Sequence, residues 1–330
     1  MAEYLTNNTD LKKVADAIRE KGGTSEALQY PDGFVAAIGE ITTGVELSII
    51  VSVTSGSVVT ATKGATVISG TAVNGSCTLI VPETGTWSVK ATHNGQTSTT
   101  ASVSIKDSYA LTLSFIKDKF ADNDWSAIIA ACHSGSVPST WVVGNSKTMT
   151  INGASYQVDI IGKNHDTYTA GGKAPLTFQL HDCYGETKNM NSSNTNSGGW
   201  TSCAMRSTHL PAILALMPTE VQNGIREVNK LTSAGSKSAT INTTADKLFL
   251  LSEIEIFGSV RYSKNGEGTQ YDYYKAGNSK VKNVSGSANY WWERSPCANY
   301  TTNFCFVTSD GNANYNNANN SRGVAFGFCF

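Results

Sequence analysis

The spacing of apolar residues changes twice along this chain, and this change limits the folds that the chain can adopt. Residues 1–44 carry apolar side chains at helical spacing, whereas residues 45–106 carry them at every second position. Residues 107–330 mix the two patterns. A single helical bundle or a single β-barrel would keep one period throughout. The sequence therefore predicts an α+β protein with three domains, bounded at residues 44 and 106.

The first segment reads as a small helical module. In "NNTDLKKVADAIREKGG" either Thr9 or Asp10 can cap a helix, and Gly22 and Gly23 follow as its stop. The apolar face of this helix is expected to consist of Leu11, Val14, Ala15 and Ile18. "YPDGF" predicts a turn before a second helix, which is marked by Phe34, Ile38 and Ile41. So short a module buries little core, and we expect it to dock on a partner.

The second segment reads as a small β-sandwich. Apolar residues alternate with polar ones in "ELSIIVSVTSG", at Leu47, Ile49, Val51 and Val53, and in "TGTWSVKAT", at Trp87, Val89 and Ala91. The turn "HNGQ" and the strand "ASVSI" follow. The phrase "VPETGTWSVKAT" resembles immunoglobulin-like modules of bacterial and phage surface proteins. That resemblance implies a spacer rather than an active site.

The third segment, residues 107–330, mixes helices with strands. "DNDWSAIIAACHSG" predicts a capped helix whose apolar side holds Trp125, Ile128, Ile129 and Cys132. Strands are expected in "TMTINGASYQVDIIG", and two short helices on either side of Pro218. "DKLFLLSEIEIFGS" reads as strand-like, and the terminal "GVAFGFCF" as a strand with one buried face. We expect helices on an irregular, mainly antiparallel sheet.

Charge and cysteine content exclude several classes of partner. The net charge is −1, only 15% of residues are charged, and no Lys/Arg block or long apolar run is present. We therefore expect no nucleic-acid partner and no membrane insertion. The start "MAEYLTNNTD" lacks the layout of a signal peptide. Seven scattered cysteines without a C-x-x-C pair predict reduced, mostly buried thiols.

Several separated motifs of the third segment resemble a known family. These motifs are "IIGKNHDTYTAGGKAPLTFQLHDC", "MNSSNTNSGGWTSCAMR", "DKLFLLSEIEIFG", "GEGTQYDYY" and "YWWERSP". Their order is similar to that in a family of phage and gut-bacterial proteins with a C-type-lectin-like fold, akin to formylglycine-generating enzymes. The resemblance covers roughly residues 140–330. The segment "VADAIREKGGTSEALQYPDGFVAAI" resembles a module at the start of tail-associated phage proteins.

Lectin-like proteins of this kind include the variable targets of diversity-generating retroelements, in which template adenines are copied with errors. The segment "GNANYNNANNS", residues 311–321, holds six asparagines, and asparagine codons carry adenine at their first two positions. Substitution from such codons never yields Lys, Gln, Glu, Met or Trp. All five are absent from Cys297 to Ser321. We therefore interpret this asparagine-rich segment as a loop whose asparagines are sites of permitted variation.

This interpretation predicts a variable polar face on a fixed aromatic framework. The framework residues are Trp291, Trp292, Phe304, Phe306, Phe326 and Phe328. The ligand-binding residues are Tyr290, Asn299, Tyr300, Asn303, Asn312, Asn314, Tyr315, Asn316, Asn317, Asn319 and Asn320. Tyr and Asn suit such a face because Tyr gives contact area at low entropic cost and Asn gives adaptable hydrogen bonds.

The resemblance then implies a phage tail-associated adhesin, assembled in the host cytoplasm and located in the virion. Its ligand would be a glycan or a protein of the host-cell surface. Residues 1–44 would attach to other tail proteins, and the chain would form a homotrimer, whose avidity compensates for modest affinity at each site. We expect no cofactor, no metal and no catalysis. The alternatives are a structural virion protein without receptor contact and an enzyme of the formylglycine-generating type.

Three groups of residues leave room for chemistry. Asn164-His165-Asp166 and His181-Asp182-Cys183 have the elements of metal or acid–base sites, but without metal-binding spacing a structural His–Asp hydrogen bond is favoured. Cys297 and Cys305 invite comparison with the cysteine pair of formylglycine-generating enzymes, yet "RSPCANYTTNFCF" does not reproduce that site. "TSDGN", residues 308–312, has too few oxygen ligands for calcium and reads as a tight turn.

Overall fold

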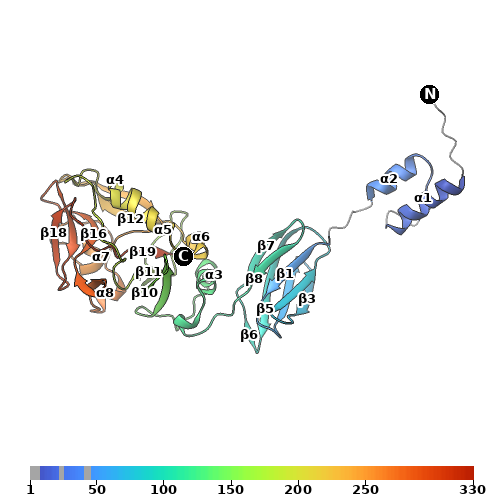
Figure 1. Cartoon of the computed structure of the whole chain (residues 1–330), viewed down its shortest axis with the longest axis horizontal. Helices are drawn as coiled ribbons and strands as arrows, with labels where there is room; N and C mark the ends of the chain where they lie inside the picture. Colours follow the sequence, from blue (N-terminus) through green and yellow to red (C-terminus); the bar gives the residue numbers. More distant parts are fainter. Residues whose placement is uncertain (1–7, 22–25, 41–45) are drawn as a thin grey trace, which may run out of the picture. The chain divides into compact units, whose positions relative to one another are not determined.

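A computed structural model describes residues 8–21, 26–40 and 46–330 of the chain. The chain divides into two compact units (Figure 1). The first comprises residues 1–95 and 100–113, and the second comprises residues 96–99 and 114–330. Strands outnumber helices among the described residues, which confirms the α+β class.

The N-terminal segment of the first unit contains helices α1 (Asn8–Glu20) and α2 (Asp32–Glu40). Their buried contact consists of Ala15, Ile18, Phe34 and Ala37, with Leu11 and Leu28 packed against it. Two expectations were wrong: Val14 is 49% exposed and Ile38 is 54% exposed. Ala37, three residues after Phe34, faces α1 instead of Ile38. Gly22, Gly23 and Ile41 lie outside the described residues.

Two sheets form the rest of the first unit. Their strands are β1 (Ser48–Ser52), β2 (Val58–Lys63), β3 (Thr66–Thr71), β4 (Ser76–Ile80), β5 (Gly85–His93), β7 (Ala101–Ile105) and β8 (Tyr109–Thr112). One sheet has the order β4-β1-β8, and the other joins β3, β2, β5 and β7. The predicted alternation is confirmed, because Ile49, Val51, Trp87, Val89 and Ala91 are all fully buried. Strand β8 follows the predicted boundary at residue 106 and pairs in parallel with β1.

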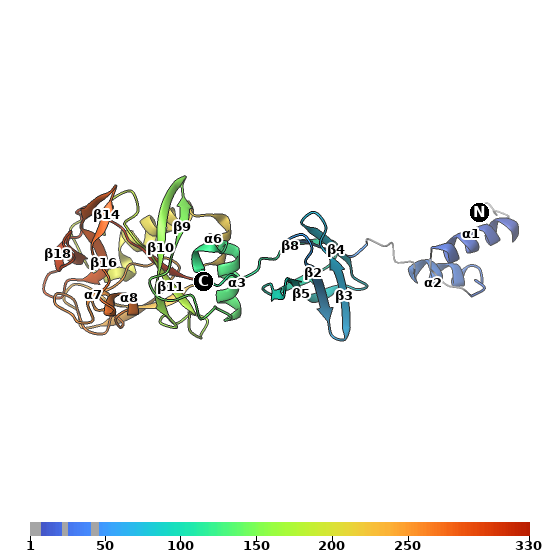
Figure 2. The same ribbon diagram turned by 90° about the horizontal axis from the view of Figure 1, so that it is seen from below.

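The second unit begins with the two-residue strand β6 (Gln96–Thr97) and contains the remaining elements (Figure 2). Its helices are η1 (Phe120–Asp122), α3 (Trp125–Ser134), α4 (Gly199–Ser202), η2 (Met205–His209), α5 (Leu210–Leu214), α6 (Thr219–Gly224), α7 (Glu253–Phe257) and α8 (Asp272–Lys275). Its other strands are β9 (Ser146–Ile151), β10 (Ala154–Lys163), β11 (Leu176–Leu180), β12 (Val228–Ser233), β13 (Ile241–Asp246), β14 (Lys282–Val284), β15 (Ser287–Asn289), β16 (Trp291–Pro296), β17 (Asn303–Val307), β18 (Ala313–Asn317) and β19 (Gly327–Cys329).

The predicted helix at residues 125–134 and the pair of helices around Pro218 are confirmed as α3, α5 and α6. The expectation of a strand in residues 246–259 was wrong, because that segment ends in helix α7. Ser252 caps this helix through the amide of Glu255, whose side chain binds back to the Ser252 amide. The four apolar residues before Ser252 are typical of a strand, and for this reason the capping box was not recognised in the sequence.

The last strand is buried, although it lies at one end of its four-stranded sheet. Strand β19 pairs with β11 in the order β19-β11-β10-β9, and Gly327 also bridges to Phe249 on the other side. All residues from Gly323 to Phe330 are buried, so the expectation of one buried face was wrong. A Cβ at Gly327 would lie 2.9 Å from the Phe178 carbonyl oxygen and from a Phe249 ring carbon. Glycine is needed there because the neighbouring backbones approach so closely.

Candidate functional site

The candidate site is built on a three-stranded antiparallel sheet with the order β16-β17-β18. The asparagine-rich segment was predicted to be a loop, but Ala313 to Asn317 form the edge strand β18. Pairing with the buried strand β17 overrides the low strand propensity of asparagine. All six framework residues predicted from sequence are buried, with exposed fractions of 4% or less.

The predicted ligand-binding residues lie on both sides of this sheet. Tyr315 is paired with Cys305, whereas Asn314 is paired with Phe306, and successive strand residues point to opposite faces. Tyr290 contacts the Phe306 ring, so it shares the side of Asn314 rather than that of Tyr315. The sequence predicted a single face, and the alternation of β18 divides it into two.

Three tyrosines gather on the Cys305 side of the sheet, and we call them the tyrosine cluster: Tyr262, Tyr300 and Tyr315. The rings of Tyr300 and Tyr315 are stacked with centroids 5.0 Å apart, and Tyr262 meets Tyr315 edge-on at 5.0 Å. The Arg261 guanidinium lies 5.2 Å from the Tyr262 ring centroid. A hydrogen bond with Tyr300 raises the pKa of Tyr315 to about 12. Tyr315 therefore presents a neutral phenol at physiological pH.

Most of the predicted asparagines already have hydrogen-bond partners within the chain. Asn303 is only 8% exposed and is removed from the binding face, because it lies in the central strand β17. The side chains of Asn312, Asn314, Asn316 and Asn320 make hydrogen bonds to neighbouring residues. In the part of the chain that the structure describes, the exposed side chains of Asn299, Asn317 and Asn319 have no such partner. These three asparagines and the tyrosine cluster are the groups free to meet a ligand.

Asn196 holds the loop that carries Tyr300. It is fully buried, and its side-chain amide donates to the carbonyl oxygens of Tyr300 at 2.7 Å and Asn303 at 2.8 Å. Its side-chain oxygen accepts from the Ser236 amide at 2.8 Å. Neither Asn196 nor Tyr262 was predicted from the sequence as a site residue. The loop of Asn196 is rich in Asn and Ser, and nothing in its composition separates a buried member from exposed ones.

The opposite side of the sheet is organised around Arg322. Its guanidinium carbon lies 4.0 Å from the Phe306 ring centroid, 4.8 Å from that of Tyr290 and 5.4 Å from that of Trp292. Burial lowers the pKa of Arg322. Tyr290 is 41% exposed and packs against both this arginine and Phe306. We therefore assign Tyr290 to the packing of this second side.

The candidate acid–base motifs have structural partners. His181 binds Asp159 through Nδ1 and Oδ2 at 2.6 Å, rather than its neighbour Asp182, and this hydrogen bond raises the pKa of His181. His181 lines a cleft of about 300 Å³. Asp166 binds Lys230, and His165 stacks on the Tyr271 ring at 4.0 Å. The described residues contain no group of three His, Cys, Asp or Glu side chains suited to a metal ion.

All seven cysteines are buried and unpaired, as expected for the thiols. Burial raises the pKa of both Cys297 and Cys305, in the latter case well above its usual value. A protonated, buried thiol is a poor nucleophile. The pair therefore lacks the electropositive, accessible surroundings that reactive cysteines require.

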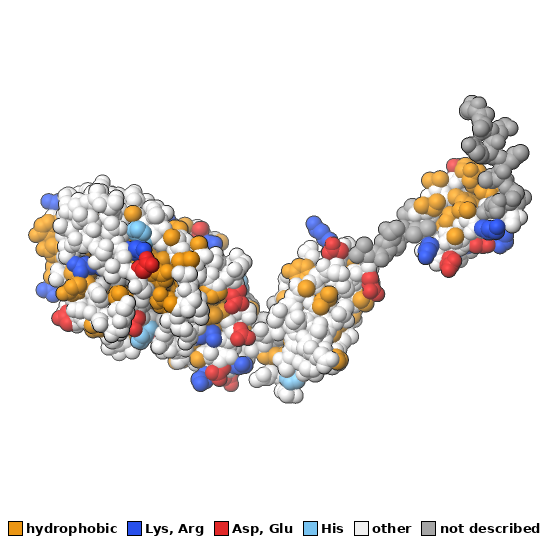
Figure 3. All heavy atoms as spheres, in the orientation of Figure 1, with side chains coloured by type: hydrophobic (Ala, Val, Ile, Leu, Met, Phe, Trp, Pro, Cys, Tyr) orange, Lys and Arg blue, Asp and Glu red, His pale blue; other side chains and the backbone are white. Residues whose placement is uncertain are grey.

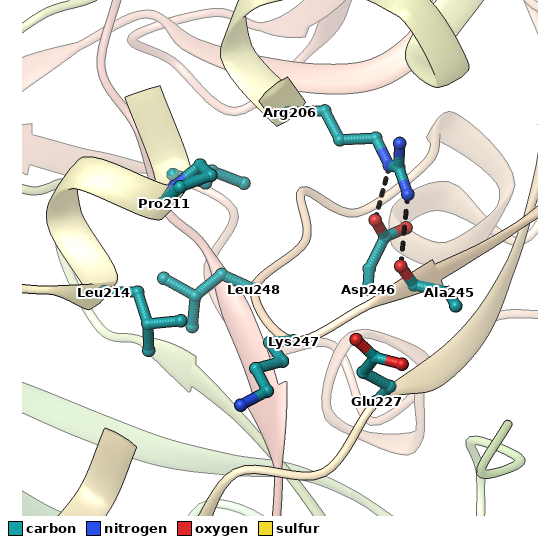
Figure 4. Close-up of a pocket in the computed structure, with 9 residues that line it drawn as sticks. Arg206, Pro211, Leu214, Glu227, Ala245, Asp246, Lys247 and Leu248 are labelled. Carbon is teal, nitrogen blue, oxygen red and sulfur yellow. Dashed lines mark hydrogen bonds and ion pairs between the residues drawn. The ribbon is translucent and has the colours of Figure 1, made fainter. Parts of the chain in front are cut away.

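A separate cleft of about 250 Å³ lies beside α5 and β13 (Figure 4). Leu214 and Leu248 form its apolar wall, and the Arg206 guanidinium donates to Asp246 at 2.5 Å. The other oxygen of Asp246 accepts from Trp200 and Thr244. Arg206 and Asp246 therefore satisfy each other, and Glu227 and Lys247 also line the cleft.

A buried charged network includes Arg294 of strand β16. Lys230 binds Asp166 at 2.8 Å, Glu255 at 2.7 Å and the Tyr271 hydroxyl at 2.9 Å. Arg294 forms two hydrogen bonds with Glu255, at 2.5 and 2.9 Å. The side chains of these charged residues are at most 3% exposed. No ligand can reach them in this conformation, so the network joins β12, α7 and β16 rather than serving as a site.

Glu293 is fully buried, and neither of its carboxylate oxygens has a hydrogen-bond partner among the described residues. Burial, reinforced by Glu253 and Glu267, raises its pKa well above the usual value. We expect Glu293→Gln to raise the free energy of unfolding by about 1–3 kcal/mol at pH 8. The gain should vanish near pH 4, because wild-type Glu293 is then protonated in both states. Urea denaturation at the two pH values measures it.

Glu253→Gln is the matched control. Its carboxylate accepts hydrogen bonds from the amides of Tyr262 and Ser263 and from the Ser263 hydroxyl. This substitution should therefore destabilise the protein, although Glu253 and Glu293 are both buried glutamates. Equal effects of the two substitutions would show that Glu293 is not held neutral.

On the face of the second unit drawn in Figure 3, charged side chains occupy small areas, and most of the surface is neutral or apolar. This agrees with the low charge of the sequence. Among the described residues, no helix has the length and apolar character needed to cross a bilayer.

Residues 168–329 are similar to a domain of unknown function, DUF6273. This region contains Asn196, the tyrosine cluster, strand β18 and all of the buried charged network except Asp166. No curated protein and no solved structure matches the chain.

Proposed function

We propose that this chain is a phage tail-associated receptor-binding protein that recognises a host-cell surface ligand through the tyrosine cluster and the neighbouring asparagines. The observation that carries the proposal is the cluster itself: three tyrosines in ring contact, with Tyr300 47% exposed, on a sheet whose central strand β17 is buried. Tyr rings supply large, rigid contact area at low entropic cost, as in antibody paratopes. The free side chains of Asn299, Asn317 and Asn319 add hydrogen-bonding groups beside them.

The finer assignments belong to the same proposal. The second unit is a C-type-lectin-like domain, and the sheets of the first unit are an immunoglobulin-like spacer. Helices α1 and α2 attach to other tail proteins, and the chain acts as a homotrimer in the virion without catalysis, cofactor or membrane insertion. Sequence resemblance supports these assignments. The exposed Val14, Val35 and Ile38 are apolar side chains available for an attachment contact. Variation by a retroelement would act on the exposed asparagines.

The combined substitution of Tyr300, Tyr315 and Asn317 by alanine should lower binding to host cells by at least about 100-fold. Removing central aromatic contacts costs 2 kcal/mol or more at a binding site. The free energy of unfolding should change by less than about 1 kcal/mol, because these side chains lie at the surface. Cell-adsorption assays and urea denaturation measure the two quantities.

Tyr109→Ala provides a matched control in the first unit, since Tyr109 is 43% exposed and Tyr300 is 47% exposed. It should leave adsorption unchanged. Full adsorption by the triple variant would disprove the proposed site and would favour a structural tail protein. A large fall in melting temperature would instead make the cluster structural. Tyr290→Ala adds a test of the division between the two sides, because it should affect binding little.

A further inference from the structure

Strand β18 is the edge strand of its sheet, and an exposed edge is open to pairing with another strand. Its register with β17 establishes which backbone groups face outward. The Ala318 amide donates to Thr302 and the Thr308 amide donates to Asn312, so hydrogen-bonded pairs fall at even-numbered residues of β18. The amides of Ala313, Tyr315 and Asn317 therefore point away from β17.

Two of these outward amides are covered by the asparagine that precedes them. The Asn314 side-chain oxygen accepts from the Tyr315 amide at 2.8 Å, and that of Asn316 accepts from the Asn317 amide at 2.7 Å. Asn320 completes the arrangement: its side-chain amide donates to the Asn316 oxygen at 3.0 Å, and its backbone amide donates to the Asn317 carbonyl at 3.1 Å.

A second strand approaching this edge would find few free groups. Within the described residues, only the backbone groups of Ala313 and the carbonyl of Tyr315 remain without a partner on the outward side of β18. A continuous β-ladder requires donors and acceptors at alternate residues along the whole edge. The side chains of Asn314 and Asn316 occupy the donors such a ladder would use.

We propose that Asn314 and Asn316 close the β18 edge and thereby prevent a second copy of this chain from adding to the sheet. Charged residues, proline and bulges protect edges in many proteins. Here neutral side chains do so in a region that carries little charge. A second copy is the relevant partner because it would bring the same unpaired edge at the same concentration. The inference is independent of any receptor.

The alternation explains why the spacing of the two asparagines matters. A side chain that bonds the amide of the next residue covers an outward amide only from an even-numbered position of β18. Asn317 stands at an odd-numbered position and Asn319 lies beyond the end of β18, so neither side chain covers an outward amide of β18 in this way. Asn314 and Asn316 are therefore the edge-closing residues of this segment, Asn312 and Asn320 bond to neighbouring residues, and Asn317 and Asn319 are free for contact.

Residue-resolved amide hydrogen exchange on the full chain tests the inference. In Asn314→Ala/Asn316→Ala, exchange at the Tyr315 and Asn317 amides should accelerate roughly threefold to tenfold at low protein concentration, the range expected for loss of one hydrogen bond. Exchange at the backbone amides of residues 314 and 316 should stay unchanged, because these donate to β17. Unchanged exchange at residues 314 and 316 also shows that the variant is folded.

Sedimentation over a concentration series gives the second readout. The alanine variant should form species larger than those of wild type as concentration rises, and Asn314→Asp/Asn316→Asp should not, because aspartate keeps the accepting oxygen. Asn317→Ala/Asn319→Ala is the matched control and should sediment as wild type does at every concentration. Unchanged exchange at Tyr315 and Asn317, or wild-type assembly of the alanine variant at every concentration, would overturn the inference.

Discussion

Lys230→Met should destabilise the second unit by about 3–5 kcal/mol, the cost of removing one partner from a buried ion pair. Lys230 is 2% exposed, and its ammonium is within hydrogen-bonding distance of Asp166, Glu255 and the Tyr271 hydroxyl. Methionine keeps much of the apolar stem but leaves Asp166 without its cation. Urea denaturation followed by tryptophan fluorescence measures the loss, and exposed Lys247→Ala serves as the control.

The same variant has a pH dependence with a defined sign. Burial alone would raise the pKa of Asp166, but the charge and hydrogen bond of Lys230, with the Thr177 hydroxyl, outweigh it and hold the pKa at about 2. The stability that Asp166 contributes is therefore present above about pH 4 and is lost as the pH falls towards 2. The difference between wild type and Lys230→Met should shrink over this window. A constant difference, or one below 1 kcal/mol at pH 7, would contradict the assigned pairing.

Adding Asp166→Asn to the variant separates the charge from the packing. In the double variant no unpaired carboxylate remains at position 166, and an asparagine oxygen can still accept from Thr177 and Tyr271. We expect it to be more stable than Lys230→Met alone. The coupling between the two positions, obtained from the four proteins, gives the interaction energy of the pair.

Periodicity predicted most of the regular elements, because it records directly which side chains are buried. Trp87, Val89 and Ala91 followed period two and are all buried. The aromatic framework near the carboxyl end came instead from the interpretation of the asparagine-rich segment, and it is buried as well. Periodicity gave wrong predictions where the buried residues do not recur at a regular spacing. In the segment that ends in β19 both faces are covered, and the apolar run before Ser252 hides a capped helix.

The site was predictable only in part, for a related reason. Asparagine content located the surface segment, but the composition of a segment does not distinguish a loop from an edge strand whose pairing partner lies elsewhere in the sequence. Once β18 pairs with β17, alternation places Asn314 and Tyr315 on opposite sides. Tyr262 reaches Tyr315 from a different part of the chain, and only tertiary structure brings the two together.

Asn196→Ala should destabilise the second unit by about 2–4 kcal/mol and should also weaken ligand binding. The substitution removes the donor to the part-buried Tyr300 carbonyl oxygen and the acceptor of the Ser236 amide. It also removes one of two donors to the Asn303 carbonyl oxygen, which still accepts from the Cys297 amide. Buried backbone groups left without partners cost about 1–3 kcal/mol each, and partial relaxation of the loop reduces the sum. Because Asn196 holds the loop that carries Tyr300, the Tyr300 ring should no longer stack stably on Tyr315.

Two further variants separate the role of the Asn196 side chain from that of its loop. Asn194→Ala changes an exposed asparagine in the same loop and should alter neither stability nor binding. Gly235→Ala should reproduce the loss of stability with Asn196 intact, because the new Cβ would lie 1.8 Å from the Asn196 carbonyl oxygen at a residue with φ of +71°. Calorimetry and cell adsorption at a temperature where each variant is folded provide the measurements. If folded Asn196→Ala adsorbs as wild type does, Asn196 supports the fold without positioning Tyr300. Contact with the ligand must then come from residues outside the loop that carries Tyr300.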